Sequence, residues 1–71
     1  MTMQLMDVVA LLHDIPAKAL SKGQVGTAVE YLGGDVFEVE FADLDGRAYA
    51  FSPVASQDII VLHHEPKRAA A

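Results

Sequence analysis

The clearest hydrophobic pattern in this sequence is a strict alternation of apolar and acidic residues between positions 36 and 41. In an extended strand, Phe37, Val39 and Phe41 point to one side, because successive side chains alternate across a strand. Glu38 and Glu40 point to the other side. This pattern is typical of an antiparallel strand with one buried face and one face in water.

A hairpin is predicted directly after this strand. Asp43-Leu44-Asp45-Gly46 carries a turn signal, because glycine supplies the positive φ that a tight turn needs. Residues 47–51 then return as the partner strand, which Ser52-Pro53 ends. Tyr49 and Phe51 share one side of that strand. If this side faces inward, Tyr49 belongs to the core with its hydroxyl at the rim.

The first part of the sequence holds a short apolar run followed by a long loop. Residues 7–12 have a spacing that also fits a helix, but adjacent β-branched residues and the following Pro16 favour a strand. The loop 13–22 contains the apolar residues Ile15 and Leu20. We therefore expect the loop to fold back over the core.

A second strand is predicted before the central alternation. Residues 24–31 alternate in the manner of a strand and contain Gly26. A glycine inside a strand marks a bulge, strong coiling or close approach of two backbones, which small barrels require. Gly33-Gly34, with Asp35, supplies a tight turn into the next strand.

Together these patterns predict an all-β fold, a small five-stranded SH3-like barrel with a long first loop and a 3₁₀ turn before the last strand. We expect this turn within residues 54–57 and the last strand at residues 59–62. The domain is expected to span residues 1–64, with a disordered tail over 65–71. An OB-like barrel is the alternative, although it usually has a longer chain and an intervening helix. A small core without disulfides supplies only about 3–5 kcal/mol, so dimerisation would help this fold.

Several stretches of the sequence resemble a known family. Residues 5–12, 22–27, 36–41 and 45–50 look like the short bacterial family described as domain of unknown function 4926, and the resemblance covers residues 5–64. It implies a small bacterial cytoplasmic protein without an assigned reaction. Its Gly-Gln-Val-Gly-Thr stretch is also similar to the strand entry of ribosomal KOW-type modules, which share the SH3-like barrel.

Charge narrows the range of partners. The formal net charge is −5, from ten acidic and five basic residues. Between residues 30 and 45 the sequence has six acidic residues and no basic one: Glu30, Asp35, Glu38, Glu40, Asp43 and Asp45. Since nucleic-acid binding needs a basic face, we expect no nucleic-acid partner. The acidic residues form either a solvated face that keeps an apolar domain dissolved or a surface that matches a basic partner protein.

The sequence offers little catalytic or metal-binding chemistry. It has no cysteine, which excludes disulfides, thiolate metal sites and cysteine catalysis. A metal site from His13, His63 and Glu65 becomes feasible if the first and last strands pair, but we expect surface histidines instead. No serine or threonine stands in a nucleophile-elbow pattern, and so short a chain has little room for a pocket of about 300 Å³ or more. We expect no enzyme activity, no cofactor and no metal.

The sequence therefore favours a non-enzymatic, cytoplasmic module that binds another protein, with no membrane association. An antitoxin- or immunity-like role toward a neighbouring gene product is the leading hypothesis. The expected interface residues are Lys18, Asp43, Asp45, Arg47 and Tyr49. The alternative is a KOW-like RNA- or ribosome-associated module. Self-association into a homo-oligomer is a third hypothesis.

Overall fold

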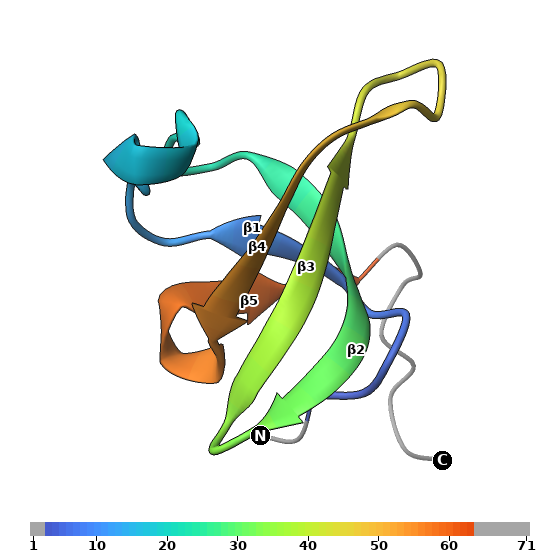
Figure 1. The fold of residues 1–71 in the computed structure, drawn as a ribbon. Helices are drawn as coiled ribbons and strands as arrows, with labels where there is room; N and C mark the ends of the chain where they lie inside the picture. The colour runs from blue at the N-terminus through green and yellow to red at the C-terminus, as the bar shows by residue number, and fades with distance from the viewer. Residues whose placement is uncertain (1–2, 64–71) are drawn as a thin grey trace, which may run out of the picture.

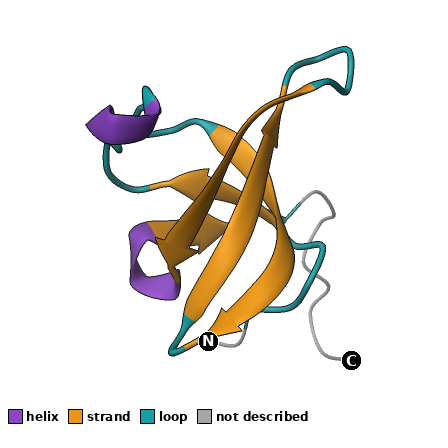
Figure 2. Ribbon diagram, viewed as in Figure 1, coloured by secondary structure: helices purple, strands orange, loops and turns teal. Residues whose placement is uncertain are grey.

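Over residues 3–63, which the computed structural model describes, the chain forms one antiparallel sheet and two short 3₁₀ turns (Figure 2). The elements are β1 (Val8–Leu11), η1 (Pro16–Lys18), β2 (Val25–Gly33), β3 (Val36–Ala42), β4 (Ala48–Ala55), η2 (Ser56–Asp58) and β5 (Ile59–Val61). The predicted all-β class, the five strands, the long first loop and the 3₁₀ turn before the last strand are confirmed. The predicted tail at 65–71 lies outside the described residues. No helix in the described range is long and apolar enough to cross a membrane.

The five strands are ordered β4-β3-β2-β1-β5, and every neighbouring pair is antiparallel (Figure 1). This order is compatible with the predicted SH3-like arrangement. The predicted closure into a barrel is not found, because β4 and β5 form the two edges and no ladder joins them within residues 3–63. The last strand has only three residues, and all of them pair with β1. Such a short strand gives the eight-residue β4 little backbone to pair with.

The core lies on the inner face of this coiled sheet. The alternation predicted for β3 is confirmed, because Phe37, Val39 and Phe41 are all buried. Burial of such side chains is the main stabilising contribution in a chain without disulfides. The buried apolar residues are Val9, Leu11, Leu20, Ala28, Phe37, Val39, Phe41, Val54 and Ile59.

The loop between β1 and β2 folds back over this core, as predicted. The Ile15 N–H donates to the Leu20 carbonyl over 2.8 Å, which pins the two ends of the loop around η1. Leu20 is buried in the core cluster, and Ile15 packs against it. Ala19, which ends η1, adopts a left-handed conformation with φ 55°. The loop is therefore held by apolar contacts as well as by backbone hydrogen bonds.

Gly26 lies where β2 comes close to β3, which is one of the three features that the sequence indicated for a glycine inside this strand. It lies on the inner face, one residue before Thr27, which pairs with Glu40. A Cβ at this position would stand 2.6 Å from Val39 Cγ1 and 2.8 Å from the Glu40 carbonyl oxygen. No side chain fits in this space without a shift of β3.

The prediction that Ser52-Pro53 ends the fourth strand is wrong. The strand continues to Ala55, and Pro53 pairs with Glu38 across the ladder. Proline is tolerated because β4 is an edge strand, where the N–H that proline lacks is not needed on the solvent side. The buried Ser52 hydroxyl donates to the Pro53 carbonyl over 3.1 Å, so its burial leaves no polar atom without a partner.

Tyr49 and Phe51 do not share one side, contrary to the sequence pattern. Phe41 pairs with Ala50, and Ala42 pairs with Ala48. Tyr49 is therefore an extra residue in a bulge. This bulge brings the Tyr49 ring to 6.4 Å from the Phe41 ring, between centroids. Phe51 pairs instead with Glu40 on the outer side.

Candidate functional site

The outer face of the sheet gathers charged and apolar side chains on one surface. Residues paired across antiparallel strands point to the same side, so the register identifies its members. Phe51 on β4 pairs with Glu40 on β3, and Glu40 pairs with Thr27 on β2. Because Val39 and Phe41 face the core, this row faces outward. The outer face consists of Val8, Ala10, Val25, Thr27, Glu30, Glu38, Glu40, Phe51, Pro53 and Ile60.

A bulge in β2 adds Glu30 to Glu38 and Glu40 on this face, and these three residues form its acidic half. By simple alternation Glu30 would follow the buried Ala28 to the inner side. The register shifts between these two residues, so that Glu30 pairs with Glu38 and points outward. Tyr31 then turns inward, and its ring lies 5.1 Å from the Phe37 ring, between centroids.

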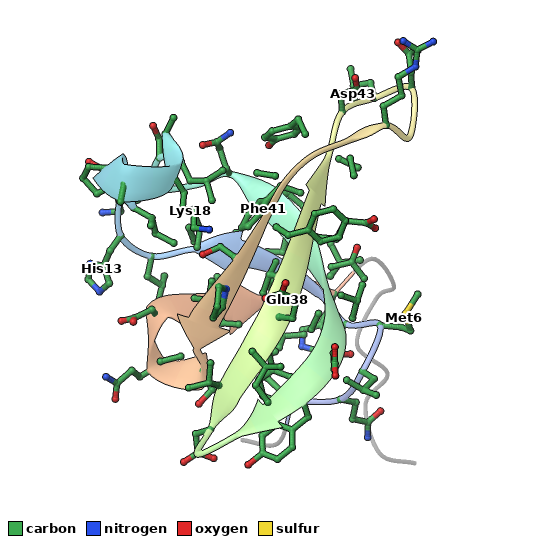
Figure 3. The ribbon with its side chains drawn as sticks, in the orientation of Figure 1. Met6, His13, Lys18, Glu38, Phe41 and Asp43 are labelled. Atoms are coloured by element: carbon green, nitrogen blue, oxygen red, sulfur yellow. The ribbon has the colours of Figure 1, made fainter. Side chains whose placement is uncertain are left out.

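The three carboxylates of the acidic half are not neutralised by this chain. Glu30 lies directly opposite Glu38, and Glu40 follows on the same side of β3. Figure 3 shows Glu38 midway along β3. Like charges at opposite positions repel each other and destabilise a sheet. Within the described range, no lysine or arginine lies within ion-pairing distance of a carboxylate, and the one histidine at such a distance is His13, which lies near Asp58 and is charged only when protonated.

An apolar row borders the acidic half. Val25 on β2, Ala10 on β1 and Ile60 on β5 are paired side by side. Val25 is 45% exposed and Ile60 is 47% exposed, while Phe51, on the far side of the glutamates, is 49% exposed. Single exposed apolar side chains are common, but apolar side chains that lie side by side within a polar rim are typical of interaction surfaces.

Three of the predicted interface residues meet at the tip of the β3–β4 hairpin. The Asp43 Oδ1 atom accepts the backbone N–H of Asp45 over 2.9 Å and that of Arg47 over 3.0 Å. Gly46 completes the turn with φ 81°, which confirms the turn predicted here. The Asp43 carboxylate therefore holds the turn, whereas Leu44 projects fully into solvent.

The other two predicted interface residues lie elsewhere. The Tyr49 hydroxyl accepts a hydrogen bond of 3.0 Å from Gln24 Nε2, which ties β4 to the end of the first loop. Lys18 is exposed on η1, and Figure 3 shows it well apart from Asp43 at the hairpin tip. The structure thus does not bring the five predicted residues into one patch.

A cleft opens where the first loop meets the end of β4. It has a volume of about 370 Å³ and is lined by Leu11, His13, Asp14, Ile15, Pro53, Val54, Ala55 and Asp58. His13 Nε2 lies 3.7 Å from Asp58 Oδ1, and the Leu12 N–H donates to the Asp58 carbonyl over 2.8 Å. The prediction that so short a chain has little room for a pocket of about 300 Å³ or more is therefore wrong, because segments about forty residues apart in the chain meet to form the walls of this cleft.

The first and last strands do pair, which was the condition for a metal site, but no metal site is assembled among residues 3–63. No group of three or more histidine, cysteine, aspartate or glutamate residues there is placed to hold a metal ion. His13 lies beside Asp58 instead, and His63 is exposed after β5. Glu65, the third ligand considered, lies outside the described residues.

Comparison with known proteins identifies a family for most of the chain. A family model with the description Domain of unknown function (DUF4926) matches residues 5–61. This match confirms the resemblance found in the sequence. Searches of curated proteins and of solved structures give no significant match.

Proposed function

We propose, from the premise that this chain belongs to the DUF4926 family, that it is a non-enzymatic module whose outer face binds a basic partner protein. One observation carries this proposal: three unneutralised glutamates stand between exposed apolar side chains on a single sheet face. The acidic half supplies attraction and orientation. The apolar row supplies area that gains free energy when it leaves water.

The partner that fits this surface carries lysine or arginine side chains around an apolar centre. A cation placed between Glu30 and Glu38 removes the repulsion that these opposed carboxylates exert in the free protein. Binding of a basic side chain at this position therefore stabilises the sheet relative to the free protein. Long-range attraction between an acidic and a basic surface also speeds their encounter, and added salt weakens it.

A basic nucleic-acid-binding protein is the partner class that best matches this chemistry. Proteins that bind phosphate backbones present basic surfaces, and an acidic sheet face competes for the same side chains. By this competition the chain would act in an antitoxin- or immunity-like role toward a neighbouring gene product. A KOW-like RNA-binding role is less favoured, because the basic side chains of residues 3–63 form no stripe: Lys18 and Lys22 share the first loop, and Arg47 lies at the β3–β4 hairpin.

A capture experiment with three baits tests the proposal. The wild-type protein, a Glu38→Gln/Glu40→Gln variant and an Asp7→Asn/Asp35→Asn variant are immobilised and exposed to an extract of the cells that encode the chain. The two variants lose equal charge, but Asp7 and Asp35 lie outside the outer face. We expect the wild type and the Asp7/Asp35 variant to retain the same basic protein in one-to-one amount, and the Glu38/Glu40 variant to lose it.

Two outcomes would overturn this proposal. Equal recovery by all three baits would mean that the outer face is not the binding surface. Binding of mixed RNA by the wild-type protein in low salt would favour the KOW-like role instead.

A further inference from the structure

The cleft between the first loop and the β4–η2 corner is large enough to hold one long side chain. Its volume of about 370 Å³ is at the lower end of the range for ligand pockets, about 300–1,000 Å³. Its lining residues come from the end of β1, the loop that follows, the end of β4 and η2. Figure 3 shows His13 at this side of the molecule, away from Asp43.

The charges that line the cleft are negative. Asp14 and Asp58 contribute two carboxylates, and no lysine or arginine is among the lining residues. The Asp14 Oδ1 atom accepts a hydrogen bond of 2.7 Å from the Lys22 backbone N–H, which fixes the Asp14 side chain. The second carboxylate oxygen of Asp14 takes no part in that bond. His13 Nε2 stands 3.7 Å from Asp58 Oδ1, beyond hydrogen-bond distance, so Asp58 keeps capacity to accept a donor.

The walls of the cleft are apolar. Leu11 and Ile15 line it from β1 and the loop, and Pro53 and Val54 line it from β4. A long side chain with an apolar stem and a charged head matches such a site, because the stem covers apolar surface while the head stays polar. The planar guanidinium of arginine presents five N–H donors in a fixed fork and stacks on flat surfaces, whereas the lysine ammonium is a compact point charge that does not stack.

We propose that this cleft binds an arginine side chain of the partner. The inference rests on the proposed function, since it names one residue of the basic partner and the place where it is held. The outer face supplies the larger contact, and the cleft adds selectivity for arginine at one position.

A titration followed by ¹H–¹⁵N correlation spectra tests this site directly. The probe is N-acetyl-arginine N-methylamide, and the control ligand is the N-acetyl-citrulline N-methylamide, which has nearly the same shape without the charge. We expect saturable shifts of the amides of His13, Asp14, Val54 and Asp58 with the arginine probe, and none with the citrulline control.

Two variants sharpen this test. Asp58→Asn and Asp14→Asn each remove one charge from the cleft while keeping an amide oxygen as an acceptor, and each is expected to weaken arginine binding about tenfold. Asp35→Asn removes the same charge in the β2–β3 turn and is expected to bind as the wild type does. A wild-type pattern of dispersed amide signals shows that each variant is folded.

Three results would contradict the binding of arginine in this cleft. They are equal shifts with arginine and citrulline, shifts confined to the amides of the outer face, and unchanged binding by both cleft variants. None of these contradicts the proposed function, because loss of the basic partner in the Glu38→Gln/Glu40→Gln bait is measured separately. A partner lost from that bait but bound normally by Asp58→Asn would leave the outer face as the sole binding surface.

Discussion

At the scale of single residues, steric space accounts for the glycine inside β2. Gly26 has an ordinary strand conformation, unlike the turn glycines such as Gly34, whose φ is 60°. What excludes a side chain at Gly26 is the nearness of Val39 Cγ1 and of the Glu40 carbonyl oxygen. The carbonyl belongs to the backbone, so the strand itself has to move if a methyl group is added.

We expect Gly26→Ala to lower the free energy of unfolding by about 1–3 kcal/mol, because overpacking forces β2 away from β3. Urea denaturation followed by circular dichroism measures this loss. The control is Gly34→Asn, since nothing lies within 4 Å of a Cβ there and asparagine tolerates a left-handed conformation. The control should stay within about 1 kcal/mol of the wild type. Equal losses in both variants would contradict a steric cause.

At the scale of elements, the β3–β4 hairpin depends on one carboxylate. Asp43 Oδ1 accepts two backbone N–H groups of the turn, so its oxygen acts as a local cap. Its charge is a separate property, because a neutral amide oxygen accepts the same hydrogen bonds. Substitution can therefore separate the structural role of Asp43 from the interface role that the sequence suggested for it.

We expect Asp43→Ala to lower the unfolding free energy by about 0.5–2 kcal/mol, as loss of a comparable side-chain cap does in helices. Asp43→Asn should retain most of the stability, since it keeps the acceptor. Thermal denaturation of the two variants, with Asp45→Asn as a charge-matched reference, provides the measurement. If Asp43→Asn proves as unstable as Asp43→Ala, the charge rather than the two hydrogen bonds holds the turn.

Elements were predictable from the sequence where local chemistry determines them. The alternation around Val39, the turn at Gly46 and the apolar loop residues Ile15 and Leu20 each lie where the pattern placed them. The continuation of β4 through Pro53 was not predictable, because it depends on that strand lying at an edge. Edge position is a property of the whole sheet, and a proline in the sequence fits either the end of a strand or its continuation along an edge.

The candidate site was predictable only in part, for a similar reason. Alternation alone puts Glu38 and Glu40 on one side of a strand. Glu30 joins them only through the bulge after Ala28, and a bulge shifts every later side chain to the opposite face. The same effect separates Tyr49 from Phe51. The cleft requires segments distant in sequence to meet, so no spacing rule could indicate it.

At the scale of the whole molecule, the outer face disfavours pairing with itself. A two-fold dimer places the same patch of both copies in contact, so six glutamates would lie within one interface with no basic residue of the outer face to neutralise them. The exposed Val25, Phe51 and Ile60 favour association, but the opposed carboxylates resist it at low ionic strength. A monomer at low ionic strength would leave this face uncovered for the proposed basic partner.

We therefore expect light scattering in low salt to give a monomer of 7.6 kDa across a wide range of dilution. The Glu38→Gln/Glu40→Gln variant loses the repulsion and keeps the apolar row, so it should reach a larger mass at high concentration. The Asp7→Asn/Asp35→Asn variant should stay monomeric, because its lost charges lie outside the outer face. A stable wild-type dimer in low salt would contradict this reasoning, since the surface assigned to a basic partner would already be covered by a second copy of the chain.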